Sequence, residues 1–159
     1  MTAPQTMKMT TPSDREVRFT RYFNAPRDLV WEAMTSPEYL PQWMLGPDGW
    51  VMDICEVDLR PGGAYRYGWR KENGKTMEIT GVFKEVKPPE LLVSTESWGG
   101  DWPEALNTMQ FTEENGRTLM TLTVLSPTKE SRDAAIGTGM TVGMEMSYAR
   151  LDEILKKGR

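Results

Sequence analysis

Side chains that could do acid–base or metal chemistry are few in this sequence. The chain has no histidine and a single cysteine, Cys55. The lack of histidine removes the usual general base, the Ser-His-Asp triad and histidine-containing metal sites. One cysteine can form neither an internal disulfide nor a thiolate zinc site. We therefore expect no metal and no cofactor, and any catalysis would have to use Asp, Glu, Tyr, Lys or Arg.

The best candidate for a binding surface is the segment AYRYGWRKE (64–72), which alternates like a β-strand. A period of two places Tyr65, Tyr67 and Trp69 on one face. Three aromatic side chains in a row would wall a pocket for a flat or apolar ligand, with phenol hydroxyls as polar contacts. For each residue taken singly, packing in the hydrophobic core is a slightly better explanation than ligand binding. In a fold with an internal cavity, the core and the cavity wall are partly the same surface, so the two interpretations overlap.

Acidic residues inside two further predicted strands are candidates for an acid or base. Glu78 alternates with Met77 and Ile79, and Glu96 follows an apolar run. A carboxyl group in an apolar cavity has a raised pKa, which suits proton transfer. Unpaired charges are rarely buried, so a solvated outer face is the commoner arrangement. We keep Glu78 as a candidate ligand-binding residue.

The sequence contains 6 tryptophans, two of which are candidates for the mouth of a pocket. Trp43 belongs to a predicted pair of short helices, and Trp102 belongs to the loop GGDWP (99–103). Loops at one end of a scaffold often carry binding residues, and paired glycines favour mobility. Packing in the core or at its rim is the alternative for both side chains.

Hydrophobic periodicity predicts an α+β protein with a single domain over residues 15–159. A strand at 16–23 precedes two short helices within 26–44, and one long helix is predicted from about 129 to 156. Between them, turn signals separate six strands, at 50–60, 64–72, 76–86, 91–98, 104–114 and 117–125. Consecutive hairpins favour a curved antiparallel sheet that wraps around the last helix.

The last helix is unevenly built. Its face toward the sheet carries Met140, Gly143, Met144 and Ser147, and branched aliphatic residues follow only from Leu151 onward. Methionine and glycine specify packing less well than leucine, so the first half could form a deformable cavity floor. Alternatively, a glycine lets the helix bend or lie close to a strand.

Composition excludes several classes of function. The 159 residues are 38% hydrophobic and 26% charged, and the net charge of −4 argues against a nucleic-acid-binding face. No apolar run approaches the roughly 20 residues that span a bilayer, and no secretory signal begins the chain. We therefore expect a cytoplasmic protein with no nucleic-acid partner and no membrane span. Residues 1–14 lack periodicity and are predicted to be a disordered arm.

Four segments resemble a known family in their order along the chain. They are FNAPRDLVWEAMTSPEYLPQWM (23–44), DLRPGGAYRYGWR (58–70), ITGVFKEVKPPELLV (79–93) and GMTVGMEMSYARLDEIL (139–155). Together they are similar to the helix-grip fold of the START and birch-pollen-allergen superfamily. The resemblance is closest to the bacterial family related to the activator of the ninety-kilodalton heat-shock-protein ATPase.

This resemblance implies a cavity between the sheet and the C-terminal helix, of the kind that takes lipids, sterols or aromatic polyketides. Our leading hypothesis is binding of a small apolar or aromatic molecule there, without turnover. A polyketide cyclase or dehydratase that uses Tyr65 or Tyr67 with an inward carboxylate such as Glu78 is one alternative. A chaperone cofactor or other protein-interaction module is another, and a homodimer is compatible with each.

Overall fold

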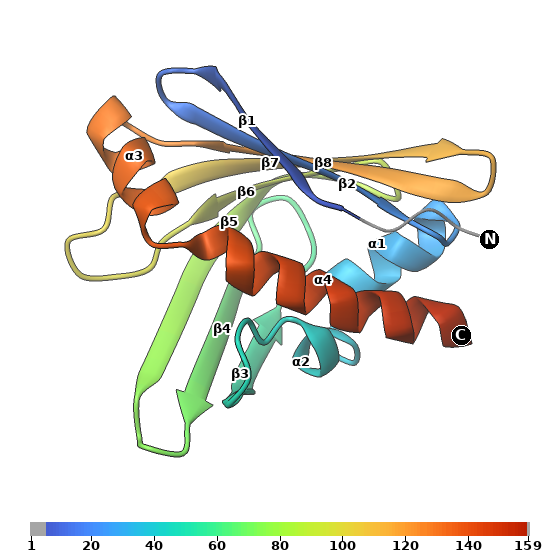
Figure 1. Cartoon of the computed structure of the whole chain (residues 1–159), viewed down its shortest axis with the longest axis horizontal. Coiled ribbons are helices and arrows are strands. Elements are labelled where there is room, and N and C mark those ends of the chain that lie inside the picture. The colour runs from blue at the N-terminus through green and yellow to red at the C-terminus, as the bar shows by residue number, and fades with distance from the viewer. Residues whose placement is uncertain (1–5, 159) are drawn as a thin grey trace.

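The computed structural model describes residues 6–158. Eight strands form one antiparallel sheet in the order β1-β2-β8-β7-β6-β5-β4-β3, and α1, α2 and α4 pack on one side of it (Figure 1). The predicted helix-grip α+β fold is confirmed. The elements are β1 (Lys8–Ser13), β2 (Glu16–Phe23), α1 (Arg27–Thr35), α2 (Leu40–Trp43), β3 (Trp50–Val57), β4 (Ala64–Lys71), β5 (Thr76–Lys87), β6 (Leu91–Glu96), β7 (Ala105–Glu114), β8 (Arg117–Leu125), α3 (Lys129–Gly137) and α4 (Met140–Lys157).

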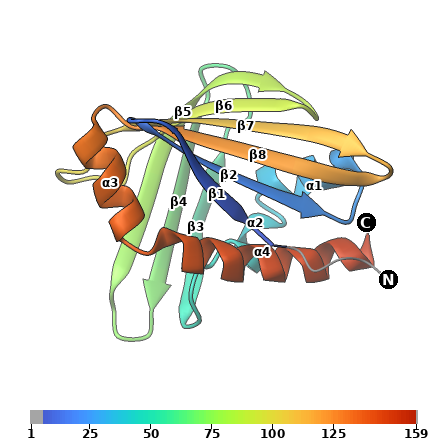
Figure 2. The ribbon, with the colours of Figure 1, turned by 45° about the horizontal axis from the view of Figure 1, so that its top comes forward.

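The sheet bends along β5, because this strand changes partners along its length. Residues 76–82 pair with β4, whereas residues 83–87 pair with β6. The register shifts between Phe83 and Glu85, and such a bulge bends a strand. In both views β3, β4 and β5 turn away from β7 and β8, and α4 lies in the angle between the two halves (Figure 1, Figure 2). The concave face of the sheet is therefore formed by both halves.

The segment Lys8–Ser13 is a strand, which corrects the prediction of a disordered arm over residues 1–14 for this part of the chain. It pairs with β2 from Lys8 opposite Thr20 to Ser13 opposite Glu16. All six side chains are exposed, so the strand has no buried face and no hydrophobic alternation by which it could be recognised. Residues 1–5 lie outside the described residues.

The single helix predicted from about 129 to 156 is two helices. Gly139 separates them with a φ of 76°, a left-handed conformation that glycine adopts without strain. Helix α3 begins at a capping box, in which Thr128 and Ser131 bond each other's backbone amides. Glycine therefore breaks the helix between α3 and α4 instead of bending it.

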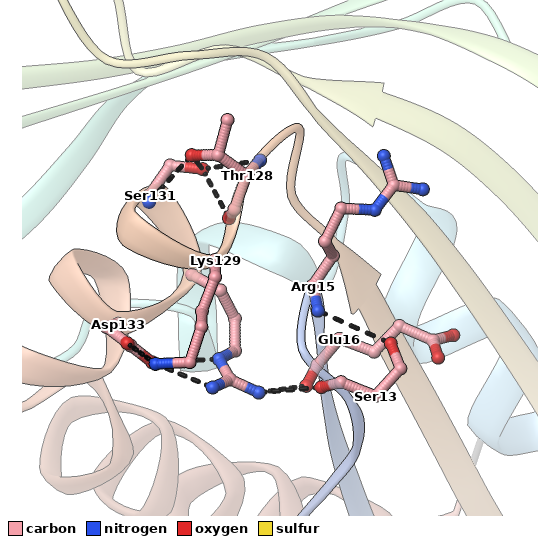
Figure 3. A network of polar contacts seen from close by, with 8 residues as sticks. Ser13, Arg15, Glu16, Thr128, Lys129, Ser131 and Asp133 are labelled. Atoms are coloured by element: carbon pink, nitrogen blue, oxygen red, sulfur yellow. Dashed lines mark hydrogen bonds and ion pairs between the residues drawn. The ribbon is translucent and has the colours of Figure 1, made fainter.

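Helix α3 is fixed to the turn between β1 and β2 by a polar network (Figure 3). The Arg132 guanidinium donates to the carbonyl oxygens of Ser13 at 2.6 Å and Glu16 at 3.4 Å. It also pairs with Asp133, which accepts from Lys129 at 2.8 Å. With α3 held at this edge of the sheet, the break at Gly139 turns the chain so that α4 can cross the concave face.

The tightest packing lies between α1, the strands β2 and β8, and the C-terminal half of α4. Phe19, Phe23, Val30, Met120 and Leu151 are all fully buried there. They come together because β2 and β8 alternate with a period of two, so that each strand presents its apolar side chains to the concave face. This end of the molecule is a closed hydrophobic core.

One ion pair lies inside that core. The Arg21 guanidinium donates to both carboxylate oxygens of Asp152, at 2.9 and 2.7 Å, and it lies 4.7 Å from the centre of the Phe23 ring. Arg21 is 5% exposed and Asp152 is 23% exposed. The helical pattern alone places Asp152 outside the face of α4 that packs on the sheet. Its pairing with Arg21 follows from the length of the arginine side chain, which reaches the flank of the helix.

We predict that Asp152→Asn lowers the free energy of unfolding by about 3 kcal/mol. The substitution leaves the Arg21 charge buried without a partner. The expected loss is at the low end of the range for broken buried ion pairs, because Asp152 keeps some contact with solvent. Urea denaturation measures the change. The exposed pair of Lys156 and Glu153 supplies the control, so Glu153→Gln should change stability little. Equal stability of the two variants would contradict this account of the pair.

Candidate functional site

The three aromatic residues of β4 share one face, as predicted. Tyr65 and Trp69 are buried and Tyr67 is half-buried, whereas Arg66 and Arg70 on the opposite face are exposed. The ring centroids of Tyr65 and Tyr67 are 5.0 Å apart, and those of Tyr67 and Trp69 are 6.2 Å apart. These rings form an aromatic wall on the concave face of the sheet.

Tyr65 has its place in that wall because the neighbouring strand carries a glycine. A Cβ atom at Gly81 would lie 2.5 Å from the Tyr65 ring and 2.1 Å from the Thr95 carbonyl oxygen. The Tyr65 hydroxyl donates a hydrogen bond to that same carbonyl oxygen. The absent side chain therefore lets the ring lie flat against β5 and reach β6.

Burial falls off along α4 from its C-terminal to its N-terminal half. Leu151 and Leu155 are buried against the sheet, but the inward residues Met140 and Met144 are only half-buried. The side chains that share this end of the concave face are also only partly buried, and they are Met52, Cys55, Tyr67 and Met109. We call these six residues the open end. Its side chains point inward and still touch solvent, so the helix and sheet are not sealed there.

A polar cluster lies on the same concave face. Glu96, at the end of β6, accepts hydrogen bonds from the Trp98 indole at 2.9 Å and from the Asn107 amide at 2.8 Å. In the register of the sheet Glu96 is opposite Ala105, and Asn107 is opposite the inward-facing Val124. The Asn107 Oδ1 atom is buried and has no hydrogen-bond partner in the described part of the chain.

The cluster adjoins buried tyrosines. Burial raises the pKa of the Tyr65 hydroxyl, and the charge of Glu96 raises it further. Burial also raises the pKa of Tyr148 on α4, against an opposing effect of the Arg21 charge and with a smaller contribution from the same carboxylate. The pKa of Tyr67 rises for the same reason of burial. These hydroxyls are protonated at neutral pH and act as hydrogen-bond donors or acceptors, not as bases.

The prediction that Glu78 faces the ligand is wrong. Its carboxylate lies on the convex face and pairs with Arg66 at 2.6 Å, and this hydrogen bond lowers the pKa of Glu78. Glu78 is opposite Gly68 in the register, so it shares the face of Arg66 and Arg70. Of the two acidic candidates, Glu96 is the one on the concave face.

Trp43 and Trp102 do not form a mouth together. Trp43 is 4% exposed, donates to the Ala33 carbonyl at 2.9 Å and stacks on Tyr148, so it belongs to the core. Trp102 is 47% exposed in the loop after β6. The tryptophan that extends the aromatic wall is Trp98, which stacks on Trp69 with ring centroids 6.2 Å apart.

Gly143 and Ser147 face a loop instead of the open end. A Cβ atom at Gly143 would lie 3.4 Å from the Pro47 side chain, and the Ser147 hydroxyl accepts from the Gly46 amide at 2.9 Å. Arg150 donates to the Gly46 carbonyl at 2.7 Å. The prediction that both residues line a cavity floor is therefore wrong. Their small side chains admit the loop of residues 44–49.

The loop of residues 44–49 is also tied to the aromatic wall. The Trp69 indole donates to the Met44 carbonyl oxygen at 2.7 Å. The loop therefore bridges α4 and β4 and forms one border of the open end. A separate shallow groove of about 330 Å³ is lined by residues at the ends of β6, β7 and β8, among them Leu106 and Leu125 on the convex face. It shares no residue with the open end.

Comparison with known proteins places the chain in a family. The family model described as "Activator of Hsp90 ATPase homolog 1-like protein" matches residues 24–156. The chain belongs to this family. The match spans α1 through nearly all of α4, so it includes the aromatic wall, the polar cluster and the open end. No helix within residues 6–158 is long and apolar enough to cross a bilayer.

Solved structures agree with this assignment to the Hsp90-activator-like family. A protein from Rhodobacter sphaeroides is 31% identical, with a TM-score of 0.90 over 97% of this chain and 100% of that one. A protein from Nitrosomonas europaea is 26% identical, with a TM-score of 0.80 over 91% and 96%. CalU16 from Micromonospora echinospora is 20% identical, with a TM-score of 0.66 over 99% and 79%, which shows a shared fold. A search of curated proteins finds no match.

The two glycines at the start of α4 should respond oppositely to alanine. Gly143→Ala should raise the free energy of unfolding by about 0.5–1 kcal/mol, because the added methyl group makes only ordinary contacts with Pro47 and Gly46 and alanine favours the helix. Gly139→Ala should lower it by about 1–2 kcal/mol, because alanine is strained at positive φ. Urea denaturation measures both, and a stability loss at Gly143 equal to that at Gly139 would contradict the assigned contacts.

The buried tyrosines should make this family member sensitive to alkali. Below about pH 10 the folded and unfolded chains both keep their phenolic protons, and above it the unfolded chain loses protons that the native chain retains. The free energy of unfolding should therefore fall as the pH rises from about 10 through the raised pKa values. Denaturation between about pH 8 and pH 11 tests this, and Tyr148→Phe should show a smaller loss than the wild type.

Proposed function

We propose that the chain binds a small apolar or aromatic molecule at the open end, between the N-terminal half of α4 and the aromatic wall of β4. The observation that carries the proposal is the contrast along α4. Leu151 is fully buried and Tyr148 and Leu155 are buried, whereas Met140 and Met144 are half-buried. A closed core would bury both halves, because exposed inward apolar surface is unfavourable.

The side chains of the open end suit a ligand that varies in shape. Met52, Met109, Met140 and Met144 are flexible and polarizable, and methionine adapts to the surface that it meets. Tyr67 and Trp69 offer flat rings beside them, which aromatic ligands stack upon. Apolar walls with a few convergent polar groups are typical of small-molecule sites. Tyr67 and Glu96 would be those polar groups.

Binding without turnover is favoured over the cyclase or dehydratase alternative. That alternative needs an inward carboxylate near Tyr65 or Tyr67, and the Glu78 carboxylate lies on the opposite face of the sheet, bound to Arg66. The inward carboxylate is Glu96, which already accepts hydrogen bonds from Trp98 and Asn107. The raised pKa values of Tyr65 and Tyr67 oppose a role as bases. The chaperone-cofactor and homodimer alternatives stay predictions.

Cys55, the only cysteine in the chain, serves as a reporter of binding. It lies at the open end, opposite Tyr67 in the register. The neutral dye Nile red should gain fluorescence with the wild-type protein and slow the reaction of Cys55 with a disulfide reagent severalfold. At a hundredfold its Kd it should raise the free energy of unfolding by about 2.7 kcal/mol.

Two tryptophan variants on α4 make the test specific. Met144→Trp should fill the open end and abolish dye binding, whereas Val142→Trp should bind like the wild type, because Val142 is 61% exposed on the outer face of the helix. Thermal denaturation confirms that both variants fold. Unchanged Cys55 reactivity and unchanged stability with saturating dye would overturn the proposed function.

A further inference from the structure

The polar cluster of Glu96 and Asn107 has acceptor atoms in excess of its donors. The Asn107 amide nitrogen donates to Glu96 at 2.8 Å, which fixes the orientation of the amide, because a carboxylate can only accept. The Asn107 Oδ1 atom must then point elsewhere, and it is buried without a partner among residues 6–158. Buried polar atoms are nearly always hydrogen-bonded, so an orphaned acceptor indicates a donor that is missing from the protein.

Glu96 also lacks a countercharge among the residues that the structure describes. Its two hydrogen bonds come from neutral groups, the Trp98 indole and the Asn107 amide. The ion pairs formed within the described residues leave Glu96 out. By contrast, the buried Arg21 is fully matched by Asp152. A partly buried carboxylate without a cation favours a positively charged group beside it.

Aromatic rings stand next to this carboxylate. Trp98, which donates to Glu96, stacks on Trp69, and Trp69 adjoins Tyr67. The faces of such rings attract cations, and tryptophan does so most strongly. A carboxylate, an unpartnered amide oxygen and several ring faces together are what a protonated amine needs, because an ammonium has three donors and no acceptor.

We propose that Glu96 and Asn107 bind the ammonium group of the ligand, and that the ligand of this chain is an amine with an aromatic or apolar body. The ammonium group donates to Glu96, and to Asn107 Oδ1 once the Asn107 side chain turns this buried atom toward the ligand. The body extends along the aromatic wall toward the methionines of the open end. This inference rests on the proposed function, since it assigns the polar end of the same ligand.

Four probes that share one ring system test the inference on the wild-type chain. They are naphthylethylamine, naphthylethanol, ethylnaphthalene and naphthylacetate, and calorimetry measures the Kd of each. The amine should bind about tenfold more tightly than ethylnaphthalene, because hydrogen bonds between charged groups are the stronger ones. The alcohol should fall between them, and the carboxylate should bind most weakly because Glu96 repels it.

Variants identify the groups responsible. Glu96→Gln should weaken binding of the amine to the level of ethylnaphthalene and leave ethylnaphthalene itself unchanged. Asn107→Leu should weaken the amine severalfold. Glu78→Gln is the matched control, since this carboxylate lies on the convex face with Arg66, and it should change none of the four affinities.

The outcomes separate the inference from the proposed function. Equal affinity for the amine and ethylnaphthalene, or an amine affinity unchanged by Glu96→Gln, would overturn the inference and leave apolar binding in place. A preference for naphthylacetate would do the same. Failure of all four probes and of Nile red to bind would overturn both. The wild-type probe series decides between these outcomes even where a variant fails to fold.

Discussion

The bidentate pair between Arg21 and Asp152 governs how α4 lies on the sheet. A guanidinium and a carboxylate meet through two parallel hydrogen bonds only in one relative orientation. Together with the buried side chains around Leu151, the pair restrains the rotation of α4 about its own axis and its distance from β2. That rotation decides which side chains of the helix face the aromatic wall. It also places Ser147 and Arg150 where they hold the loop of residues 44–49.

A firmly held end allows the other end of the helix to stay underpacked. Around Leu151 the helix, α1, β2 and β8 form a dense core, which stabilises the whole domain. Voids and partly exposed apolar side chains are unfavourable, so an open end needs compensation elsewhere in the same domain. The polar anchors of α3, centred on Arg132, supply a second fixed point. The open end lies between the two, where neither constraint forces tight packing.

The sequence contains most of the information about the fold, because the strands with one buried face alternate clearly. Where both faces are exposed, as in Lys8–Ser13, there is no alternation, and only pairing with β2 makes the segment a strand. The break at Gly139 was not predictable from periodicity, since a helix pattern continues on both sides of it. It depends on the left-handed conformation of Gly139.

The candidate site was harder to predict than the fold. Glu78 and Glu96 have similar surroundings in the sequence, and which one faces inward depends on the register of the strands. A shift of one residue reverses the face of a whole strand. The shared face of the aromatic residues of β4 could be predicted because they lie at alternate positions of a single strand. Within one strand, alternate side chains always point to the same face. Gly143 and Ser147 share a helix face with Met140, but the loop that covers them comes from a distant part of the chain.

Gly81, on the strand beside the aromatic wall, affects how that wall is built. The Tyr65 ring occupies the space where any other residue would place its Cβ atom. A larger residue at 81 would need a smaller one at 65 and also a shift of the β6 backbone, because its Cβ atom would lie 2.1 Å from the Thr95 carbonyl oxygen. The shape of the aromatic wall on β4 is therefore set partly by the close approach of β5 and β6 at a position that has no side chain.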